Sequence, residues 1–351
     1  MSAKLLSRER LEELVARFAS SRVAVLGDYF LDKYLDVDPS LEEPSVETGK
    51  PAHQVAAVRC YPGAAGTVVS NLAALGTGSM HALGFTGDDG ESFELRRGLA
   101  KLGCSTDHLH TCADRFTPTY LKPRNMTVPG LAGEHSRYDT KNRKPTPTEI
   151  EQAVIGSLDA VVSQVQGVII LDQVEARDCG AVTGAVRERL AELARANPNV
   201  YFWADSRRRI HEFRNVIIKP NEFEAVGNED PRPGDAVDVD ELRAAVGDLR
   251  ERTGAPLFIT RGSEGMFVSD PEWTAVPGVR VGGETENTGA GGRATAGCVV
   301  RRCGGASFVE AAVIGNLVAS ITIQQLATTG TASPEQVVQR LRVWHEQQGG
   351  A

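Results

Sequence analysis

The chain has 351 residues, of which 41% are hydrophobic and 24% are charged, a composition typical of a globular protein with a full core. Its formal net charge of -8 argues against nucleic-acid binding, because nucleic-acid-binding proteins usually carry a basic surface. No apolar run approaches the roughly 18–20 residues of a membrane span, and residues 1–20 show a mixed-charge helical pattern instead of a secretory signal. The six cysteines form no Cys-x-x-Cys pair, so we expect reduced thiols in a cytoplasmic protein.

Short apolar runs alternate with amphipathic stretches along most of the chain. Such alternation predicts an α/β fold, with a mostly parallel sheet covered by helices on both faces. Ligands bind such sheets at the carboxyl ends of the strands. In chain order, we expect a strand at 23–26, a helix at 62–76, a strand at 81–85, a helix at 91–102, a strand at 168–171, a helix at 181–196, strands at 200–204 and 216–218, a helix at 238–253, a strand at 257–260, and helices near 307–326 and 334–347.

Two segments interrupt this alternation. Residues 38–60 are polar and then alternate around 54–58, which predicts an exposed strand pair, and residues 117–140 suggest a further strand and loop. We expect these segments to form a small β lid on a single domain that covers residues 1–351. Exposed strand edges favour pairing between chains, so we also expect a homodimer through the β lid.

Candidate site residues occur just after the first expected strand and at the start of the helix expected at 62–76. Asp28 and Asp32 come just after the first strand, where carboxylates could accept hydrogen bonds from several sugar hydroxyls. The alternative role for both is to cap or close a turn. Residues 62–67 read Pro-Gly-Ala-Ala-Gly-Thr, a glycine-rich turn into a helix that is a weak signal by itself.

Three later turns carry candidate residues. Residues 84–90 predict a strand-to-helix turn with a capping Asp. Asn221 and Glu224 lie three residues apart on one helix face and could hold Mg²⁺ through its water shell, although the same spacing is typical of a capping box. Residues 260–266 read Thr-Arg-Gly-Ser-Glu-Gly-Met, which could bring backbone amides to a phosphate or could simply close a hairpin.

The most informative segment is residues 286–292, Glu-Asn-Thr-Gly-Ala-Gly-Gly, where a loop turns into a helix. The free N–H groups and the positive end of the helix dipole predict an anion site here. This segment resembles the Asp-Thr-Thr-Gly-Ala-Gly-Asp signature of the ribokinase-like (PfkB) carbohydrate kinases. The turns at 62–67 and 84–90 and the Asn-x-x-Glu motif also resemble this family, in the same order along the chain.

Residues 27–32 resemble the Gly-Asp-x-x-x-Asp opening of the heptose 7-phosphate kinases within this family. The resemblance implies a ribokinase-like three-layer sandwich. It further implies transfer of the γ-phosphate of ATP, with Mg²⁺, to a hydroxyl of a sugar or sugar phosphate similar to heptose 7-phosphate. The turn at 62–67 departs from the family pattern, because Ala64 replaces a Gly and Thr67 replaces an Asn that contacts sugar.

The resemblance also assigns roles to individual residues. Lys122, Arg124 and Arg137 would hold a phosphate on the sugar, although solvated surface charges are the ordinary alternative. Asn316 would line the nucleotide pocket unless it is simply an exposed helix residue. The anion hole would comprise Gly289, Ala290 and Gly291; the nucleotide site Asn221, Glu224, Thr260, Gly262, Ser263, Gly265 and Asn316; the metal site Glu224 and Asn221; and the substrate site Asp28, Asp32, Gly63, Ala64 and Thr67 with the three cations.

Gly292 stands where the family has its catalytic Asp, which accepts the proton of the sugar hydroxyl. Loss of a general base typically lowers the rate by about 10²–10⁴-fold, while the anion hole survives. The chain could therefore be a natural low-activity relative, or a pseudokinase that acts as a sugar- or nucleotide-binding regulator. It could also be an Asp→Gly variant of an active kinase, or another carboxylate such as Glu286 or Asp28 could act as the base.

Overall fold

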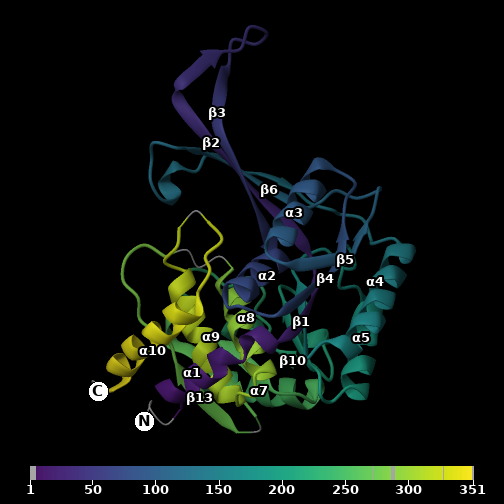
Figure 1. Ribbon diagram of the computed structural model, residues 1–351, viewed down its shortest axis with the longest axis vertical. Helices are drawn as coiled ribbons and strands as arrows, with labels where there is room; N and C mark the ends of the chain where they lie inside the picture. Colours follow the sequence, from purple (N-terminus) through teal and green to yellow (C-terminus); the bar gives the residue numbers. More distant parts are fainter. Residues whose placement is uncertain (1–4, 271, 286–288, 327, 350–351) are drawn as a thin grey trace.

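A nine-stranded sheet forms the centre of the protein in the computed structural model, which describes residues 5–270, 272–285, 289–326 and 328–349 (Figure 1). The strand order is β13-β12-β11-β10-β9-β8-β1-β4-β5, and the pairs from β5 to β11 are parallel, whereas β12 and β13 pair antiparallel. The strands are β1 (Arg22–Gly27), β4 (Ser79–Thr86), β5 (Cys104–Thr111), β8 (Gly167–Asp172), β9 (Tyr201–Ser206), β10 (Ile217–Ile218), β11 (Leu257–Thr260), β12 (Gly265–Ser269) and β13 (Trp273–Pro277).

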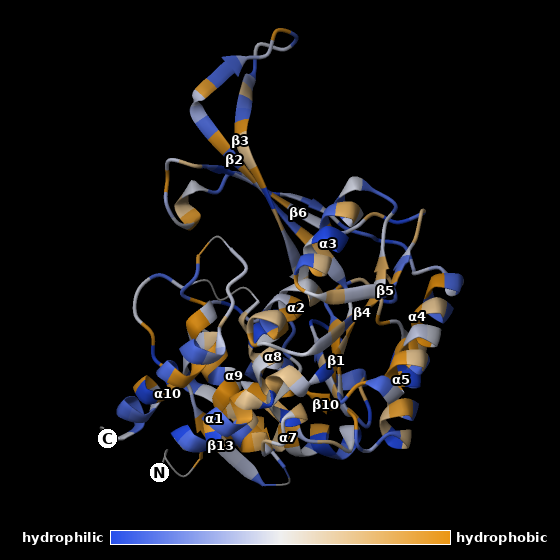
Figure 2. Ribbon diagram, in the orientation of Figure 1, coloured by the Kyte–Doolittle hydropathy of each residue, from blue (hydrophilic) through white to orange (hydrophobic). Residues whose placement is uncertain are grey.

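Helices cover both faces of this sheet because both faces are apolar. Along β1, Val23 and Val25 belong to one buried cluster and Ala24 and Leu26 to the other, as the two-residue period of a strand requires. Apolar residues follow the inner sides of the surrounding helices (Figure 2). One face packs against α1 (Arg8–Ala16), α2 (Ala65–Ala74), α3 (Gly90–Lys101), α8 (Ala290–Cys303), α9 (Phe308–Thr322) and α10 (Pro334–Gly349), and the other against α4 (Thr148–Val161), α5 (Gly184–Ala196), α6 (Glu222–Ala225) and α7 (Val239–Thr253).

A second, four-stranded sheet leaves the main body at the end of β1. Its strand order is β3-β2-β6-β7, and the β2–β3 hairpin projects far from the rest of the molecule (Figure 1). The segments 38–60 and 117–140 both fall within this sheet. The β2–β3 pairing begins with Tyr29 opposite Ala64, so the hairpin starts earlier in the chain than the sequence pattern predicts. The strands are β2 (Tyr29–Pro44), β3 (Pro51–Ala64), β6 (Thr119–Asn125) and β7 (Tyr138–Thr140).

The structure differs from the sequence-based expectation in the start of one helix and in several elements that were not predicted. The helix expected from residue 62 begins at Ala65, because residues 62–64 pair with β2 as the end of β3. The strand β5, the helix α4 and the β12–β13 hairpin were not predicted. The β5 sequence is mostly polar because this strand lies at the edge of the sheet, so it lacks the apolar run of a central strand.

All six cysteines are free thiols, as expected. Across the described ranges, none of the helices combines the length and the apolar character that crossing a bilayer requires.

Candidate active site

A cleft with a volume of about 670 Å³ opens between the carboxyl ends of the central strands and the second sheet. Strand ends, the start of α8 and one face of the second sheet all contribute to its walls. The described residues that line it are Phe30, Asp32, Tyr34, Ala64, Thr67, Tyr120, Lys122, Arg137, Leu171, Gln173, Asp205, Arg207, Arg208, Lys219, Asn221, Glu224, Glu229, Asp230, Pro231, Thr260, Gly289, Gly291, Gly292, Arg293, Thr328 and Thr329.

A glycine-rich turn leads into α8 at one wall of the cleft. Gly289 has φ of +79°, a left-handed conformation that glycine adopts without steric cost. At Gly291, a Cβ atom would lie only 3.0 Å from Nζ of Lys219, so the absence of a side chain lets the ammonium reach the backbone. Free helix N–H groups and a cation therefore meet here, as anion binding requires. Glu286, Asn287 and Thr288 of the same motif lie outside the described residues.

The buried Lys219 and the partly exposed Asp205 form an ion pair beside this turn. Nζ of Lys219, just after β10, lies 3.1 Å from Oδ2 of Asp205 on β9. Glu224 is close by, since burial and the negative charge of Asp205 raise the pKa of the Glu224 carboxyl to about 7. The Lys219 ammonium thus lies near both carboxylates.

Asn221 and Glu224 form a capping box at the start of α6. The Asn221 side chain accepts from the backbone N–H of Glu224 at 2.8 Å, and Oε2 of Glu224 accepts from the N–H of Asn221 at 2.7 Å. Both residues also line the cleft, so the capping role and a role at the site coexist.

The donor set fits Mg²⁺ better than a metal held entirely by protein. No group of three or more His, Cys, Asp or Glu residues suited to a metal occurs within the described part of the chain. Two carboxylates, Asp205 and Glu224, nevertheless line the cleft, with Lys219 and Arg207 as nearby cations. Mg²⁺ is usually held by one or two carboxylates, with water and substrate phosphates supplying the other ligands. These two residues would hold it here.

The second sheet contributes cations and aromatic rings to the opposite wall. Nζ of Lys122 lies 2.9 Å from Oδ1 of Asp32 and donates to the hydroxyl of Tyr34 at 3.3 Å. Burial lowers the pKa of Lys122, but the Asp32 carboxylate and the Tyr34 hydroxyl outweigh it and raise the pKa overall. The Arg137 guanidinium stacks 4.7 Å above the Tyr120 ring. Arg137 is also paired with Asp139, at 2.8 Å from Nε to Oδ1, so this wall presents ion-paired cations and aromatic faces to the cleft.

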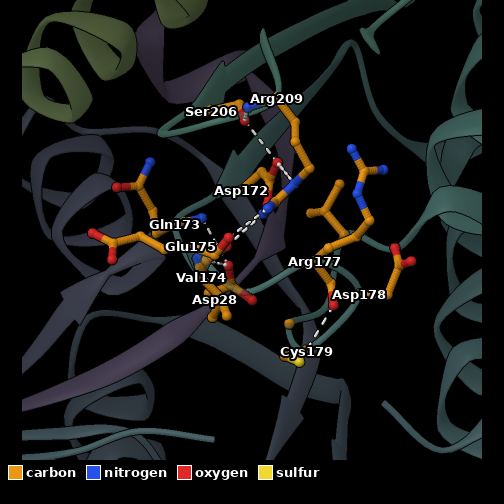
Figure 3. A network of polar contacts seen from close by, with 12 residues as sticks. Asp28, Asp172, Gln173, Val174, Glu175, Arg177, Asp178, Cys179, Ser206 and Arg209 are labelled. Atoms are coloured by element: carbon orange, nitrogen blue, oxygen red, sulfur yellow. Dashed lines mark hydrogen bonds and ion pairs between the residues drawn. The ribbon is translucent and has the colours of Figure 1, made fainter. Parts of the chain in front are cut away.

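Asp28 lies outside the cleft and fastens a loop of the chain. Its carboxylate accepts from the backbone N–H groups of Gln173 at 2.7 Å, Val174 at 2.9 Å and Ala181 at 2.7 Å (Figure 3). Burial and the nearby charge of Asp172 raise the Asp28 pKa to about 6, although the three N–H donors act in the opposite direction. Asp28 therefore anchors this loop, as its alternative turn role predicts, and it does not line the cleft.

Asp172 and Arg209 complete this network beneath the cleft. Nε of Arg209 donates to Oδ2 of Asp172 at 3.0 Å, and the Ser206 hydroxyl donates to the same oxygen at 2.7 Å (Figure 3). Arg209 also donates to the Val174 and Glu175 carbonyls. The loop after β8 is thus held on both sides, which brings Gln173 to the cleft wall.

Several other predicted site residues also do not line the cleft. Asn316 is buried and donates to the carbonyls of Val276 at 3.2 Å and Pro277 at 3.1 Å, so it is neither in the cleft nor exposed. Arg124 instead lies 3.8 Å from Asp36 and donates to a loop carbonyl. The remaining predicted residues outside the lining are Gly63, Ala290, Gly262, Ser263 and Gly265.

Packing explains the placement of two of these glycines. A Cβ at Gly63 would lie 2.6 Å from Oδ2 of Asp32, so Gly63 makes room for that carboxylate. A Cβ at Gly265 would lie 2.2 Å from the Val276 carbonyl, and its φ of +99° suits the tight β11–β12 turn. The turn at 260–266 therefore closes a hairpin and offers only Thr260 to the cleft.

The sequence-based prediction missed cleft residues that follow predicted strands. Asp205, Arg207 and Arg208 come directly after the apolar strand at 200–204, so the rule that pointed to Asp28 also applies to them. Lys219 lies two residues before the Asn-x-x-Glu motif and was not predicted as a site residue. By contrast, the sequence does not predict that Phe30, Tyr34 and Tyr120 line the cleft. Which face of the second sheet their side chains occupy depends on the register of the strands.

Comparisons with known proteins identify the family of the chain. The model of the pfkB family carbohydrate kinases matches residues 22–336. The chain is 29% identical over 320 residues to the bifunctional protein HldE of Azorhizobium caulinodans, covering 90% of this chain and 63% of that protein. It is 26% identical over 346 residues to HldE of Pelobacter propionicus, covering 97% of this chain and 67% of that protein. The chain therefore spans roughly two thirds of the length of these relatives.

Solved structures show the same fold at lower identity. Arabidopsis thaliana ribokinase, complexed with ribose and ATP, superimposes with a TM-score of 0.63 at 15% identity, covering 92% of this chain and 99% of the ribokinase. Escherichia coli phosphofructokinase-2 in complex with fructose-6-phosphate gives a TM-score of 0.64 at 16% identity, covering 92% of this chain and 98% of that one. The chain shares the ribokinase-like fold with these structures. The chain belongs to the pfkB family of carbohydrate kinases.

Proposed function

We propose that the protein binds ATP with Mg²⁺ and transfers its γ-phosphate to a hydroxyl of a sugar phosphate of the heptose 7-phosphate class, at a low rate. The glycine turn at 289–292 and Lys219 would hold the transferred phosphoryl group at the start of α8. Asp205 and Glu224 would hold Mg²⁺, which neutralises charge on the polyphosphate when bound. Arg207 and Arg208 add positive charge at the cleft rim.

The acceptor would lie against the second sheet, which we propose acts as a lid. Asp32 can accept hydrogen bonds from sugar hydroxyls, while Lys122 and Arg137 can bind a phosphate on the sugar. Thr67 at the start of α2 offers one further hydroxyl. The two HldE relatives support an acceptor of the heptose 7-phosphate class.

The low rate rests on a single observation, which is that Gly292 lines the cleft beside Gly289 and Gly291 without any side chain. Its nearest non-local neighbour would be Cγ2 of Val68, 3.3 Å from a Cβ built at Gly292, so a larger residue needs only a small adjustment. A proton acceptor at this point of the helix start would thus fit, and the chain lacks it.

Gly292→Asp tests this function, with Gly292→Asn as the matched control that has the same shape and no basic oxygen pair. ADP release would be followed with heptose 7-phosphate, fructose 6-phosphate and ribose as acceptors. We expect Gly292→Asp to raise kcat by about 10²-fold or more and Gly292→Asn to leave it low. Wild-type turnover at ordinary kinase rates of roughly 1–100 s⁻¹ would contradict the disabling role of Gly292.

A sugar- or nucleotide-binding regulator is the second candidate function, favoured by the same glycine. The nucleotide-binding walls would remain while the base is absent, so binding without turnover is physically consistent. Isothermal titration with ATP and Mg²⁺ separates the two functions. Binding, together with no activity of Gly292→Asp on any acceptor, would favour the regulator.

We also propose a homodimer formed through the β2–β3 hairpin. The hairpin exposes apolar side chains, including Leu41 at 56%, Val55 at 43% and Val58 at 56%, along strands that project from the body (Figure 1). Light scattering at micromolar concentration would give the mass of two chains, and Val58→Glu would shift it toward one. A monomeric mass for the wild type would reject the dimer.

A further inference from the structure

Ala64, at the junction of β3 and α2, has a backbone conformation that alanine disfavours. Its φ is +51° and its ψ is -113°. These angles lie outside the left-handed helical region and correspond to the first central position of a type II′ turn, which glycine usually occupies. Among the described residues, the other non-glycine residues with positive φ are Asp178 and Asn215, whose residue types tolerate it. Ala64 therefore keeps its methyl group against the preference of its own backbone.

The two glycines that flank Ala64 are explained by packing inside the protein. A Cβ at Gly63 would lie 2.6 Å from Oδ2 of Asp32, and a Cβ at Gly66 would lie 2.4 Å from Cβ of Pro62. Ala64 lies between these glycines, is half-buried and lines the cleft. Strained backbone conformations concentrate at ligand-binding sites, where the surrounding structure maintains them. The strained position in this turn is thus the one that borders the cleft.

The wall around Ala64 lies next to the start of α8. A Cβ at Gly292 would lie 3.3 Å from Cγ2 of Val68, which belongs to the start of α2. Thr67 and Phe30 line the cleft together with Ala64. This wall therefore combines a methyl group and an aromatic ring with a single hydroxyl. A sugar hydroxyl directed at its apolar part would lose hydrogen bonds to water without replacement.

We propose that Ala64 is a specificity-determining residue for the acceptor. The inference rests on the proposed placement of a sugar in the cleft, and it names a feature of that sugar. The cleft would select acceptors that carry a hydrogen, and not a hydroxyl, toward Ala64, close to the hydroxyl that receives the phosphoryl group. Glycine at this position would relieve the backbone and leave room for the additional oxygen.

The test is isothermal titration of the purified full-length chain with two matched pairs of sugars. The pairs are glucose 6-phosphate with 2-deoxyglucose 6-phosphate, and ribose with 2-deoxyribose. We expect the wild type to bind the deoxy sugar about tenfold or more tightly in at least one pair, and Ala64→Gly to remove most of this preference by binding the parent sugar better. In a Gly292→Asp background, Ala64→Gly should change the kcat/KM ratio of the same pair in the same direction.

Ala73→Gly is the matched control, because it makes the same change in the last turn of α2, away from the cleft lining. It should lower the midpoint of thermal unfolding, since glycine is a poor helix former, and leave the preference between the paired sugars unchanged. Ala64→Gly should leave the midpoint unchanged or raise it, because glycine adopts positive φ without steric cost.

Four outcomes would overturn the inference. They are equal wild-type binding of the parent and deoxy sugars in both pairs, a preference that Ala64→Gly retains, a loss of stability in Ala64→Gly as large as in Ala73→Gly, and no binding of any of the four sugars to either the wild type or Ala64→Gly. A binding preference that Ala64→Gly removes, with Gly292→Asp inactive on every acceptor, would support the inference and reject the phosphoryl transfer of the proposed function.

Discussion

Lys219 and Asp205 form an ion pair beside the glycine turn, with Nζ of Lys219 3.1 Å from Oδ2 of Asp205. The pair joins the ends of two neighbouring parallel strands, and the Lys219 side chain is 3% exposed. The pair therefore links the stability of these two strand ends to the charge of the candidate active site.

Removal of the ammonium should destabilise the protein strongly. In Lys219→Met, Asp205, whose side chain is only 14% exposed, is left without its partner next to Glu224, whose carboxyl already has a raised pKa. Breaking a buried pair typically costs about 3–5 kcal/mol of unfolding free energy. Urea denaturation followed by circular dichroism measures this loss.

The double variant Lys219→Met/Asp205→Asn is the control for the ion pair. Since it also removes the unpaired carboxylate, we expect it to recover part of the stability lost in Lys219→Met. A strictly additive cost of the two single changes would show that the two side chains are not coupled.

Glu224 should make stability depend on pH near neutrality. Its pKa is about 7 in the folded protein, because of burial and then Asp205, against an ordinary value of 4.5, so the folded state binds this proton more readily than the unfolded state. The contribution of Glu224 is therefore fully present below about pH 4.5 and is lost as the pH rises through about 7. The wild type minus Glu224→Gln difference in unfolding free energy should fall by about 3 kcal/mol across that window.

Glu310→Gln provides a control of opposite sign. Burial opposes the shift, but hydrogen bonds from Arg10 and Ser307 lower the pKa of Glu310 overall. Stability from Glu310 is thus present above its ordinary pKa and is lost as the pH falls. Equal pH profiles for the wild type and Glu224→Gln would show that Glu224 titrates normally.

Asp28 should control the order of the loop between residues 173 and 181. In Asp28→Asn, an NH₂ group replaces one of the oxygens that accept the three backbone N–H groups, so at least one buried donor loses its partner. This costs about 1–3 kcal/mol per unsatisfied group. Hydrogen exchange read by mass spectrometry should show faster exchange in this loop, with β8 itself still protected. Unchanged exchange in the loop would reject the role of Asp28 as its anchor.

Lys122 should select for phosphorylated acceptors. In a Gly292→Asp background, Lys122→Met should raise KM for a sugar phosphate by about 10–100-fold and change KM for the unphosphorylated sugar far less. Arg124→Met changes a cation of the same strand that lies outside the cleft, beside Asp36, and is the matched control. A similar rise in KM for both kinds of acceptor would mean that Lys122 positions Asp32 and does not bind phosphate.

The central sheet and most helices could be predicted because their apolar periodicity is local. The strand at 257–260, for example, has the predicted bounds, and the helix expected at 238–253 begins one residue later. The placement of Asp28 could not be predicted, because its three N–H partners lie about 145 residues or more further along the chain. A carboxylate after a strand looks the same in sequence whether it faces a ligand or a neighbouring loop.

The fixed loop beneath the cleft also bears on the order of folding. Asp28 can accept the N–H of Gln173 only after β1 has paired with β8, a contact between segments 145 residues apart in sequence. Contacts of such separation require a large loop to close first, so they tend to form late. We therefore expect substitutions at Asp28 to accelerate unfolding and hardly to slow refolding, which corresponds to a φ-value near zero. On this view, the wall that carries Gln173 is completed after the surrounding sheet has assembled.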